Sequence, residues 1–454
     1  MRTGVVALAL VLLVLAPVRA AHAQFSFDAR RFGMGGVSLG RDGNVSRFNP
    51  AYRAVKKRST PNGAPRISIP IPIGLVDFLK QHPLGRLRYD PMFNPDSAGF
   101  NPIALMNLIT SPPIFYDVKK PPAPTNDVEF TIGKNAFVMD LGEAQVLIPE
   151  QEFGLGTTSR VLDIAGPGIA GFHFGVMWFL HYDIGLTLDD SLRRVLKDAD
   201  SVRANSIYSI RADALGQSGI APTISYSGRI THGAGGADSS DDGFYLGGAV
   251  HYYLGAGYAR GQGPAGFVTG TPVFVTTPTP LLDDTVWTSN KAFATGFGGD
   301  VGVAWISGPF EVGFGINDIG ATLSWSDTKI QRFHYFSVGD SLSTELVANH
   351  VPTKTKLPIT YVANSAIRMG TGTTVGGDVV NSGRGTVIHV GVEQRYTVFA
   401  IRGGVSRDQR KHMQFGFGGG LRFGGLGLDI GFWTHSPALS EKRAMTMATS
   451  ISIY

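Results

Sequence analysis

The sequence predicts an all-β fold, a transmembrane antiparallel β-barrel, and three observations support that prediction. Apolar residues alternate with small or polar residues at a period of two from about residue 168 to the C-terminus, which is typical of strands. The runs are longer than most soluble strands. The face opposite the apolar one is rich in glycine, which suits a closed barrel with lipid outside and a filled, polar lumen.

The composition supports a membrane barrel and excludes several other classes. The chain has 454 residues, 60 Gly and no Cys, and only 17% are charged, against roughly 25% in ordinary soluble domains. The absence of cysteine excludes disulfide scaffolds, cysteine zinc sites and thiol nucleophiles. The formal net charge is +5 and the basic residues are dispersed, so no nucleic-acid partner is predicted. Beyond the N-terminus, no apolar run is long enough for a transmembrane helix.

Residues 1–23 have the features of a secretory signal peptide. A basic start precedes the apolar run Val5 to Leu15, and Ala21-His22-Ala23 is a small-x-small cleavage pattern before Gln24. The alternative is a short membrane anchor, but Pro17 and Arg19 interrupt the apolar run. An exported barrel is predicted to lie in the bacterial outer membrane.

The region between the signal and residue 168 is irregular. Short strands are predicted over 66–73 and 128–139, and long loops near 74–127, 189–205 and 231–242. A helix is predicted from Asp189 to Val202, because its apolar residues follow helical spacing and Asp189 or Asp190 can cap it. A helix within 100–115 would place four apolar residues on one side, where they could capture a hydrophobic ligand: Ile103, Met106, Leu108 and Ile109.

The strands follow one another from residue 168 to the end. The apolar faces include Phe172 to Trp178, Phe310 to Ile316 and Met413 to Phe423. Counting such runs predicts a dozen to sixteen strands, within the range of bacterial barrels. The last strand, 444–454, ends in an aromatic residue, as the signal for the barrel assembly machinery usually does, although Tyr454 lies opposite the apolar face.

Charged residues on the small-residue faces are predicted to point into the lumen. Most are expected to form a paired network there, with contact to a ligand as the alternative: Glu393, Arg395, Arg402, Arg422 and Asp429.

Motifs for catalysis or cofactor binding are not found. The chain has no H-E-x-x-H, no phosphate-binding loop and no complete G-x-G-x-x-G, and no Ser stands in a recognisable nucleophile context. The acidic stretch 238–243 lacks the glutamate that a calcium loop needs at its twelfth position. We therefore predict no cofactor, no metal site and no enzyme activity, with a hydrolytic barrel as a minor alternative.

The N-terminal sequence resembles that of a known transporter superfamily. Ala29 to Gly36 reads A-R-R-F-G-M-G-G, and Arg47 to Ala51 reads R-F-N-P-A. These motifs are similar to the signature of FadL-type outer-membrane transporters. The resemblance implies a barrel of about 14 strands over residues 66–454 and a hatch inside its lumen over residues 24–65, with these hatch residues: Gly33, Met34, Gly35, Gly36, Asn49, Pro50 and Ala51.

A second resemblance concerns the C-terminal third. The stretches 315–320, 357–359 and 391–407 are similar to the PorV branch of the same superfamily. Two functions remain open. The first is passive uptake of hydrophobic, fatty-acid-like molecules through a hatch-gated lumen, with membrane lipid and a small hydrophobic ligand as partners. The alternative is a non-transporting barrel that docks or shuttles exported proteins at the cell surface.

Overall fold

The fold is dominated by antiparallel strands. A computed structural model describes residues 22–453 except 26–27, 42–44, 57–66, 88, 95–96, 98, 100, 102–103, 105–107, 109–114, 120–123, 133–135, 143, 151, 167–168, 198–200, 233–240, 274–278, 291–292, 336–342, 371 and 436–442. One sheet has 18 strands and a second has three. Among the described residues, none of the helices has the length and hydropathy to cross a bilayer.

The barrel wall runs in chain order, and consecutive strands pair antiparallel except for β11 with β12 and β14 with β15. Its strands are β7 (Phe153–Ala165), β8 (Phe172–Leu188), β9 (Ile207–His232), β10 (Gly243–Val268), β11 (Thr279–Ser289), β12 (Ala294–Ser307), β13 (Phe310–Tyr335), β14 (Ser343–Lys356), β15 (Thr360–Met369), β16 (Thr373–Ser382), β17 (Gly385–Arg395), β18 (Phe399–Arg407), β19 (Met413–Phe423), β20 (Leu426–His435) and β21 (Ala444–Ile453). The predicted all-β antiparallel architecture is confirmed.

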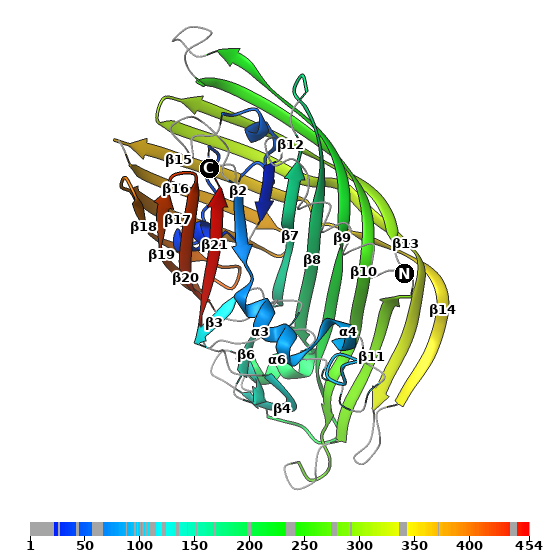
Figure 1. Ribbon diagram of the computed structural model, residues 1–454. Coiled ribbons are helices and arrows are strands. Elements are labelled where there is room, and N and C mark those ends of the chain that lie inside the picture. The colour runs from blue at the N-terminus through cyan, green and yellow to red at the C-terminus, as the bar shows by residue number, and fades with distance from the viewer. Residues whose placement is uncertain are drawn as a thin grey trace.

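Part of the wall extends beyond the rest of the barrel. β11 and β12 lie in succession between β10 and β13, so together they occupy one wall position. β14 and β15 likewise follow one another beside β13. The result is a tall, curved wall of β8 to β14 that projects past the shorter strands β16 to β21 (Figure 1).

Two short N-terminal strands fill the space between the first and last wall strands. β1 (His22–Phe25) pairs with β7, and β2 (Ile67–Ile71) pairs with β21. β1 also contacts β2, so the sheet returns on itself (Figure 1). The predicted cleavage point before Gln24 lies within β1, and residues 1–21 of the predicted signal peptide lie outside the described residues.

The outward faces of the strands expose large apolar side chains in the predicted alternation. On β8, the exposed fractions are 49% for Phe172, 60% for Phe174 and 45% for Trp178, whereas Met177 and Phe179 on the other face are buried. The same outward pattern continues around the barrel at Ile224, Phe244, Val250, Trp305, Phe314, Val390, Phe417 and Leu428. Such a surface is unstable in water but matches the hydrocarbon core of a membrane.

The two ends of the barrel differ in their connections. At one end, four hairpins turn over two or three residues: 308–309, 370–372, 396–398 and 424–425. At the other end lie the long connection 189–206 and the excursion 72–152. We call these the turn end and the loop end. We infer that the loop end is the outer one, because in outer-membrane barrels short turns face the periplasm and long loops face outside. Two connections depart from this division: 383–384 is short and lies at the loop end, and 233–242 is long and lies at the turn end.

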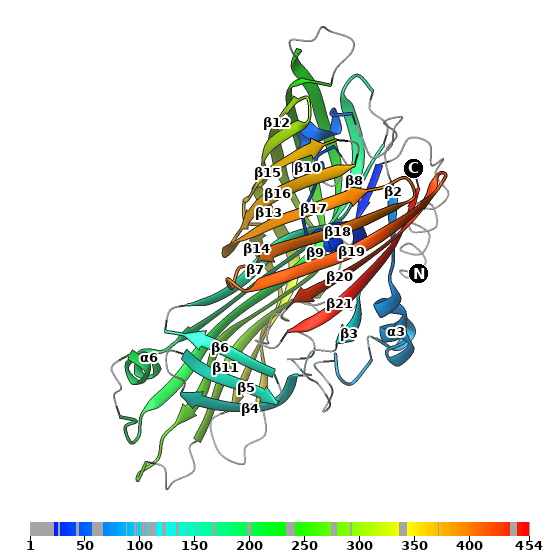
Figure 2. The ribbon, with the colours of Figure 1, turned by 90° about the vertical axis from the view of Figure 1, so that its left-hand side faces the viewer.

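The loop end carries small added elements. They are α3 (Ile73–Gln81), α4 (Leu84–Leu87), β3 (Tyr116–Lys119), the sheet β4 (Pro124–Ile132), β5 (Ala136–Gly142) and β6 (Ala144–Pro149), and α6 (Asp190–Lys197). Phe137, Ile148 and Leu192 from this group pack with Tyr208 and Ile210 of β9. Tyr208 and Ile210 share a face of β9 with the exposed Ile220, so the added elements cover the outer face of the projecting wall (Figure 2).

Two predictions about this region are corrected. The strand predicted over 128–139 is two strands, β4 and β5, which pair antiparallel with each other, and neither belongs to the barrel sheet. The helix predicted from Asp189 to Val202 is present as α6 but ends at Lys197 among the described residues. Asp189 caps it as expected, since its Oδ1 accepts a hydrogen bond of 2.7 Å from the backbone N–H of Leu192.

Candidate functional site in the barrel lumen

The candidate site is built on an N-terminal segment that lies against the inward faces of the wall. We call residues 28–56 the plug. It contains α2 (Ala29–Gly33), which contacts β18 to β21, and the 3₁₀ helix η1 (Pro50–Arg53), which contacts β9, β10 and β12. Because these two groups of strands lie on different sides of the barrel, the plug crosses the space between them (Figures 1 and 2).

Local sequence explains how the plug folds. The Asp28 side chain caps α2 by accepting a hydrogen bond from the Arg30 backbone N–H at 3.1 Å, and the helix ends before Gly35, whose φ of +69° favours glycine. Asn49 caps η1 in the same way, accepting from the Ala51 backbone N–H at 3.1 Å, with Pro50 in the first turn. The predicted hatch motifs are therefore the two capped turns of the plug.

Wall glycines let the plug backbone approach the strands directly. A Cβ atom at Gly404 would lie 2.2 Å from the Met34 carbonyl oxygen, and one at Gly247 would lie 2.4 Å from the Ala51 nitrogen. The same close approach occurs at Gly315, Gly391, Gly416 and Gly431. The glycine-rich inward faces seen in the sequence are thus the surface that receives the plug, a role that sequence alternation alone did not reveal.

A cluster of buried charges fixes α2 to the wall. Arg30 binds Glu393 of β17 in a bidentate pair, with Nε–Oε2 and Nη2–Oε1 distances of 2.7 Å. Arg402 Nε and Arg395 Nε also reach Glu393, at 2.6 and 2.5 Å, and Arg402 binds Asp429 at 2.8 Å. We call these five residues the Glu393 cluster. Four of them were predicted lumen residues; Arg422 instead donates to the Gly424 carbonyl at the turn end.

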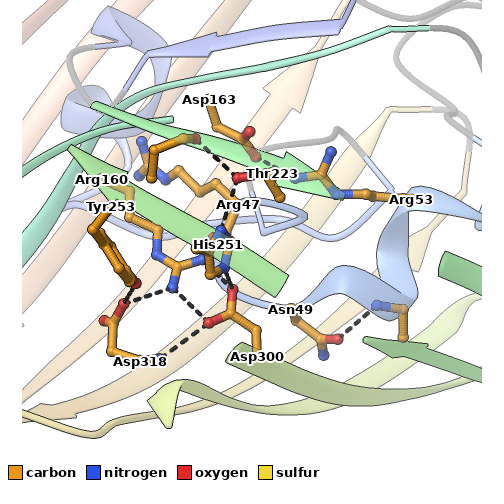
Figure 3. A network of polar contacts seen from close by, with 12 residues as sticks. Arg47, Asn49, Arg53, Arg160, Asp163, Thr223, His251, Tyr253, Asp300 and Asp318 are labelled. Carbon is orange, nitrogen blue, oxygen red and sulfur yellow. Dashed lines mark hydrogen bonds and ion pairs between the residues drawn. The ribbon is translucent and has the colours of Figure 1, made fainter. Parts of the chain in front are cut away.

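A second buried cluster fixes the other part of the plug (Figure 3). Arg160 of β7 binds Asp300 of β12, with Nη1–Oδ2 and Nη2–Oδ1 distances of 2.5 and 2.8 Å, and its Nη1 also donates to the Arg47 carbonyl at 2.7 Å. Asp318 of β13 accepts from Arg160 and from the Tyr253 hydroxyl, at 3.2 and 2.7 Å. Sequence analysis assigned no role to Arg160, Asp300 or Asp318, although Asp300 follows two glycines on a small-residue stretch and Asp318 lies within the stretch 315–320.

His251 joins this second cluster in a chain of hydrogen bonds. Its Nε2 lies 2.7 Å from Asp300 Oδ2, and its Nδ1 lies 2.7 Å from Thr223 Oγ1 (Figure 3). The order hydroxyl, imidazole, carboxylate resembles that of hydrolytic triads. Thr223, His251 and Asp300 are only 4%, 2% and 3% exposed, however, so the chain is closed to a substrate in this structure.

Other residues of the plug, including the predicted hatch residue Asn49, also contact the wall. Asn49 Nδ2 donates to the carbonyls of Val303 and Phe314 at 2.9 and 3.2 Å, and Tyr52 accepts a hydrogen bond from Asn364 at 2.8 Å. The Gly40 backbone N–H donates to Glu311 at 2.8 Å. The plug is therefore bonded to the wall along its length.

Arg47 of the plug does not take part in these ion pairs. The Arg47 guanidinium is buried, and among the described residues its three nitrogens have no hydrogen-bond partner. It stacks on the Phe48 ring, 4.7 Å from the centroid. Burial, reinforced by the nearby positive charge of Arg31, lowers the pKa of Arg47 well below its ordinary value.

A cavity of about 340 Å³ lies against the plug on its loop-end side. Phe32 and Phe48 of the plug form one side, and the loop 408–412 and the outer ends of β16, β17 and β20 form the other. Its lining includes Arg31, Leu155, Val380, Val387, His389 and Trp433. Of the predicted capture residues, Ile103, Met106 and Ile109 lie outside the described residues, and Leu108 does not line this cavity. In the part of the chain that the structure describes, no acidic and histidine cluster is arranged to hold a metal ion.

The fold and the site together define a class of protein. A sheet that returns on itself, an apolar outer surface and a polar lumen crossed by an N-terminal segment are the features of a plugged outer-membrane β-barrel. The chain is accordingly a protein of the bacterial outer membrane.

Comparisons with known proteins add likenesses of fold. Among solved structures, the chain is similar to the toluene transporter TodX of P. putida, with 10% identity, coverage of 72% of this chain and 86% of that chain, and a TM-score of 0.33. The toluene transporter TbuX of Ralstonia pickettii matches with 11% identity, coverage of 71% and 85%, and a TM-score of 0.32. A FadL homologue of Pseudomonas aeruginosa matches with 12% identity, coverage of 70% of this chain and 80% of that chain, and a TM-score of 0.33. No family model and no curated protein matches.

Proposed function

We propose that this barrel takes up small hydrophobic molecules passively across the outer membrane. The observation that carries the proposal is the cavity of about 340 Å³, which lies on the loop-end side and stops at the plug. A solute from outside would bind there by burying apolar surface against Phe32, Phe48 and Trp433, at about 0.8 kcal/mol per CH₂ group. The proposal needs no catalytic step.

The lining of the cavity favours an amphipathic solute with an anionic end. Arg31, Arg160 and Arg410 line it together with one carboxylate, that of Asp408. The Arg47 guanidinium, which has no hydrogen-bond partner among the described residues, is adjacent to Phe48. A carboxylate bonded to a buried guanidinium would offset part of the cost of burying that cation. Fatty-acid-like molecules combine the required chain and head group.

Release toward the turn end requires the plug to move. The plug separates the cavity from that end, and it is bonded to the wall through the Glu393 cluster and through Arg160 and Asn49. We propose that residues 28–56 act as the hatch and that passage involves breaking some of these contacts. Weakening an anchor should then increase passage as long as the barrel stays folded.

Filling the cavity tests the binding step. Val387 lines the cavity, so Val387→Trp should fill it and raise the dissociation constant of added dodecanoic acid at least tenfold, which corresponds to about 1.4 kcal/mol. Val387→Ala leaves the cavity open, so its dissociation constant for dodecanoic acid should be within about threefold of that of the unmodified protein. Native mass spectrometry of the purified barrel in mild detergent measures both. Equal occupancy in the two variants would contradict the cavity as the binding site.

The same spectra address the alternative function. A co-purifying protein at fixed stoichiometry, with no dodecanoic acid bound, would favour a barrel that docks exported proteins. Uptake of labelled dodecanoic acid by cells that carry either variant provides the second measurement. A Val387→Trp variant that loses binding but transports normally would place the route outside this cavity.

A further inference from the structure

The apolar outer surface of the barrel continues past the end of β2. Ile69 and Ile71 on the outward face of β2 are 46% and 38% exposed. The chain then enters α3 at Ile73, which is 38% exposed, and Val76, one turn along, is 54% exposed. Leu84, the first residue of α4, is 73% exposed. A run of this kind on a loop in water would be an unexplained apolar patch.

These side chains are not used for the packing of the loop itself. The segment is held from inside by Phe78, His82 and Phe93, whose ring centroids lie 4.8 Å apart for the first pair and 5.2 Å for the second. His82 Nδ1 lies 2.7 Å from Asp90 Oδ2, and this hydrogen bond lowers the pKa of the Asp90 carboxyl. The loop thus has its own fixed core, and Val76 and Leu84 point away from it.

The position of α3 agrees with a membrane boundary. α3 contacts β3, whose Tyr116 and Val118 are 43% and 46% exposed and which pairs with β21. Figure 2 shows α3 outside the wall beside β3, at the loop end. Lys80 is exposed four residues after Val76, hence on the same side of the helix, where its stem can cover apolar surface while its ammonium reaches lipid head groups.

We propose that residues 73–87 form an interfacial anchor that lies on the outer leaflet, with Val76 and Leu84 in the boundary between head groups and acyl chains. The occupant of this surface is membrane lipid, because the patch is continuous with the lipid-facing side of β2. Lys80 and Arg86 favour anionic head groups. The inference is independent of whether the lumen transports a solute.

The absence of cysteine makes a direct test possible, since each introduced cysteine is the only labelling site. Val76→Cys carries a nitroxide in the full-length barrel reconstituted into vesicles containing anionic phosphatidylglycerol. Its accessibility to oxygen and to a water-soluble nickel chelate is compared with that of Phe174→Cys, on the lipid-facing side of β8, and Leu346→Cys, on the projecting strand β14. Gln81→Cys is the control on α3 itself, about 140° around the helix from Val76.

The expected oxygen-to-nickel ratio at Val76 is close to that at Phe174 and severalfold above those at Leu346 and Gln81. A ratio at Val76 no higher than at Leu346 would overturn the proposal, since the residue would then lie in water. Low accessibility to both reagents would overturn it as well, because protein would be covering the site. Heat-modifiable migration on gels verifies that each variant is folded before the comparison is made.

Discussion

Replacing Glu393 with Gln is expected to release α2 from the barrel wall while the barrel stays folded. Glu393 is fully buried and binds the guanidinium groups of Arg30, Arg395 and Arg402 at 2.7, 2.5 and 2.6 Å. Gln is similar in size but neutral, so the change removes the negative charge shared by the buried Arg30 and Arg402 and the partly exposed Arg395. Breaking a buried ion pair from one side typically costs about 3–5 kcal/mol.

Trypsin provides the measurement, because the plug contains several arginines that are inaccessible in the folded protein. Arg30, Arg41 and Arg47 are 2%, 1% and 1% exposed. In the Glu393→Gln variant, cleavage at these positions should become at least tenfold faster, while the heat-modifiable migration of the barrel is retained. Glu345→Gln changes an exposed carboxylate on β14 and serves as the control.

Two other outcomes carry information. Unchanged cleavage in Glu393→Gln would show that the cluster does not anchor the plug. If the plug is loosened, the hatch proposal further predicts faster entry of labelled dodecanoic acid into cells that carry the variant. If the plug is loosened but dodecanoic acid enters at the same rate, the Glu393 cluster still anchors the plug. The proposal that the plug gates entry would then be contradicted.

Replacing Gly404 with Val is expected to push the plug out of its position. A Cβ at Gly404 would lie 2.2 Å from the Met34 carbonyl oxygen and 2.7 Å from the Gly35 nitrogen, and both are backbone atoms that cannot rotate away. The strand tolerates valine, which favours β structure. The strain must therefore be relieved by the plug, at a cost of about 1–3 kcal/mol by analogy with overpacked cores.

The neighbouring residue supplies a matched control. Gly403 is on the same strand, and a Cβ there would have no atom within 4 Å. Gly403→Val should leave both trypsin resistance and thermal stability close to those of the unmodified barrel. In Gly404→Val, trypsin should cleave the plug readily. Equal resistance in the two variants would mean that the plug does not pack on the wall at this point.

The sequence alone determined the class of fold because a strand's pleat fixes where its side chains point. Alternation at Phe172 to Trp178 and Met413 to Phe423 therefore predicted an apolar outer face, and these residues are exposed in that pattern. The N-terminal motifs also marked the capped turns of the plug, since capping is a local property of a few residues. The boundary between β4 and β5 was missed although Gly133 and Asn135, which favour turns, stand between the two apolar runs.

The tertiary structure decided how the plug meets the wall. Arg30 and Glu393 are 363 residues apart in the chain, and no local pattern pairs them; they meet because the sheet closes around α2. The same holds for Arg160 and Asp300, which are 140 residues apart. Glycine on an inward face is visible in the sequence, but only the closed barrel shows which glycines, such as Gly404 and Gly416, receive the plug backbone. Periodicity encodes side-chain direction, whereas contact across the lumen depends on strand order and register.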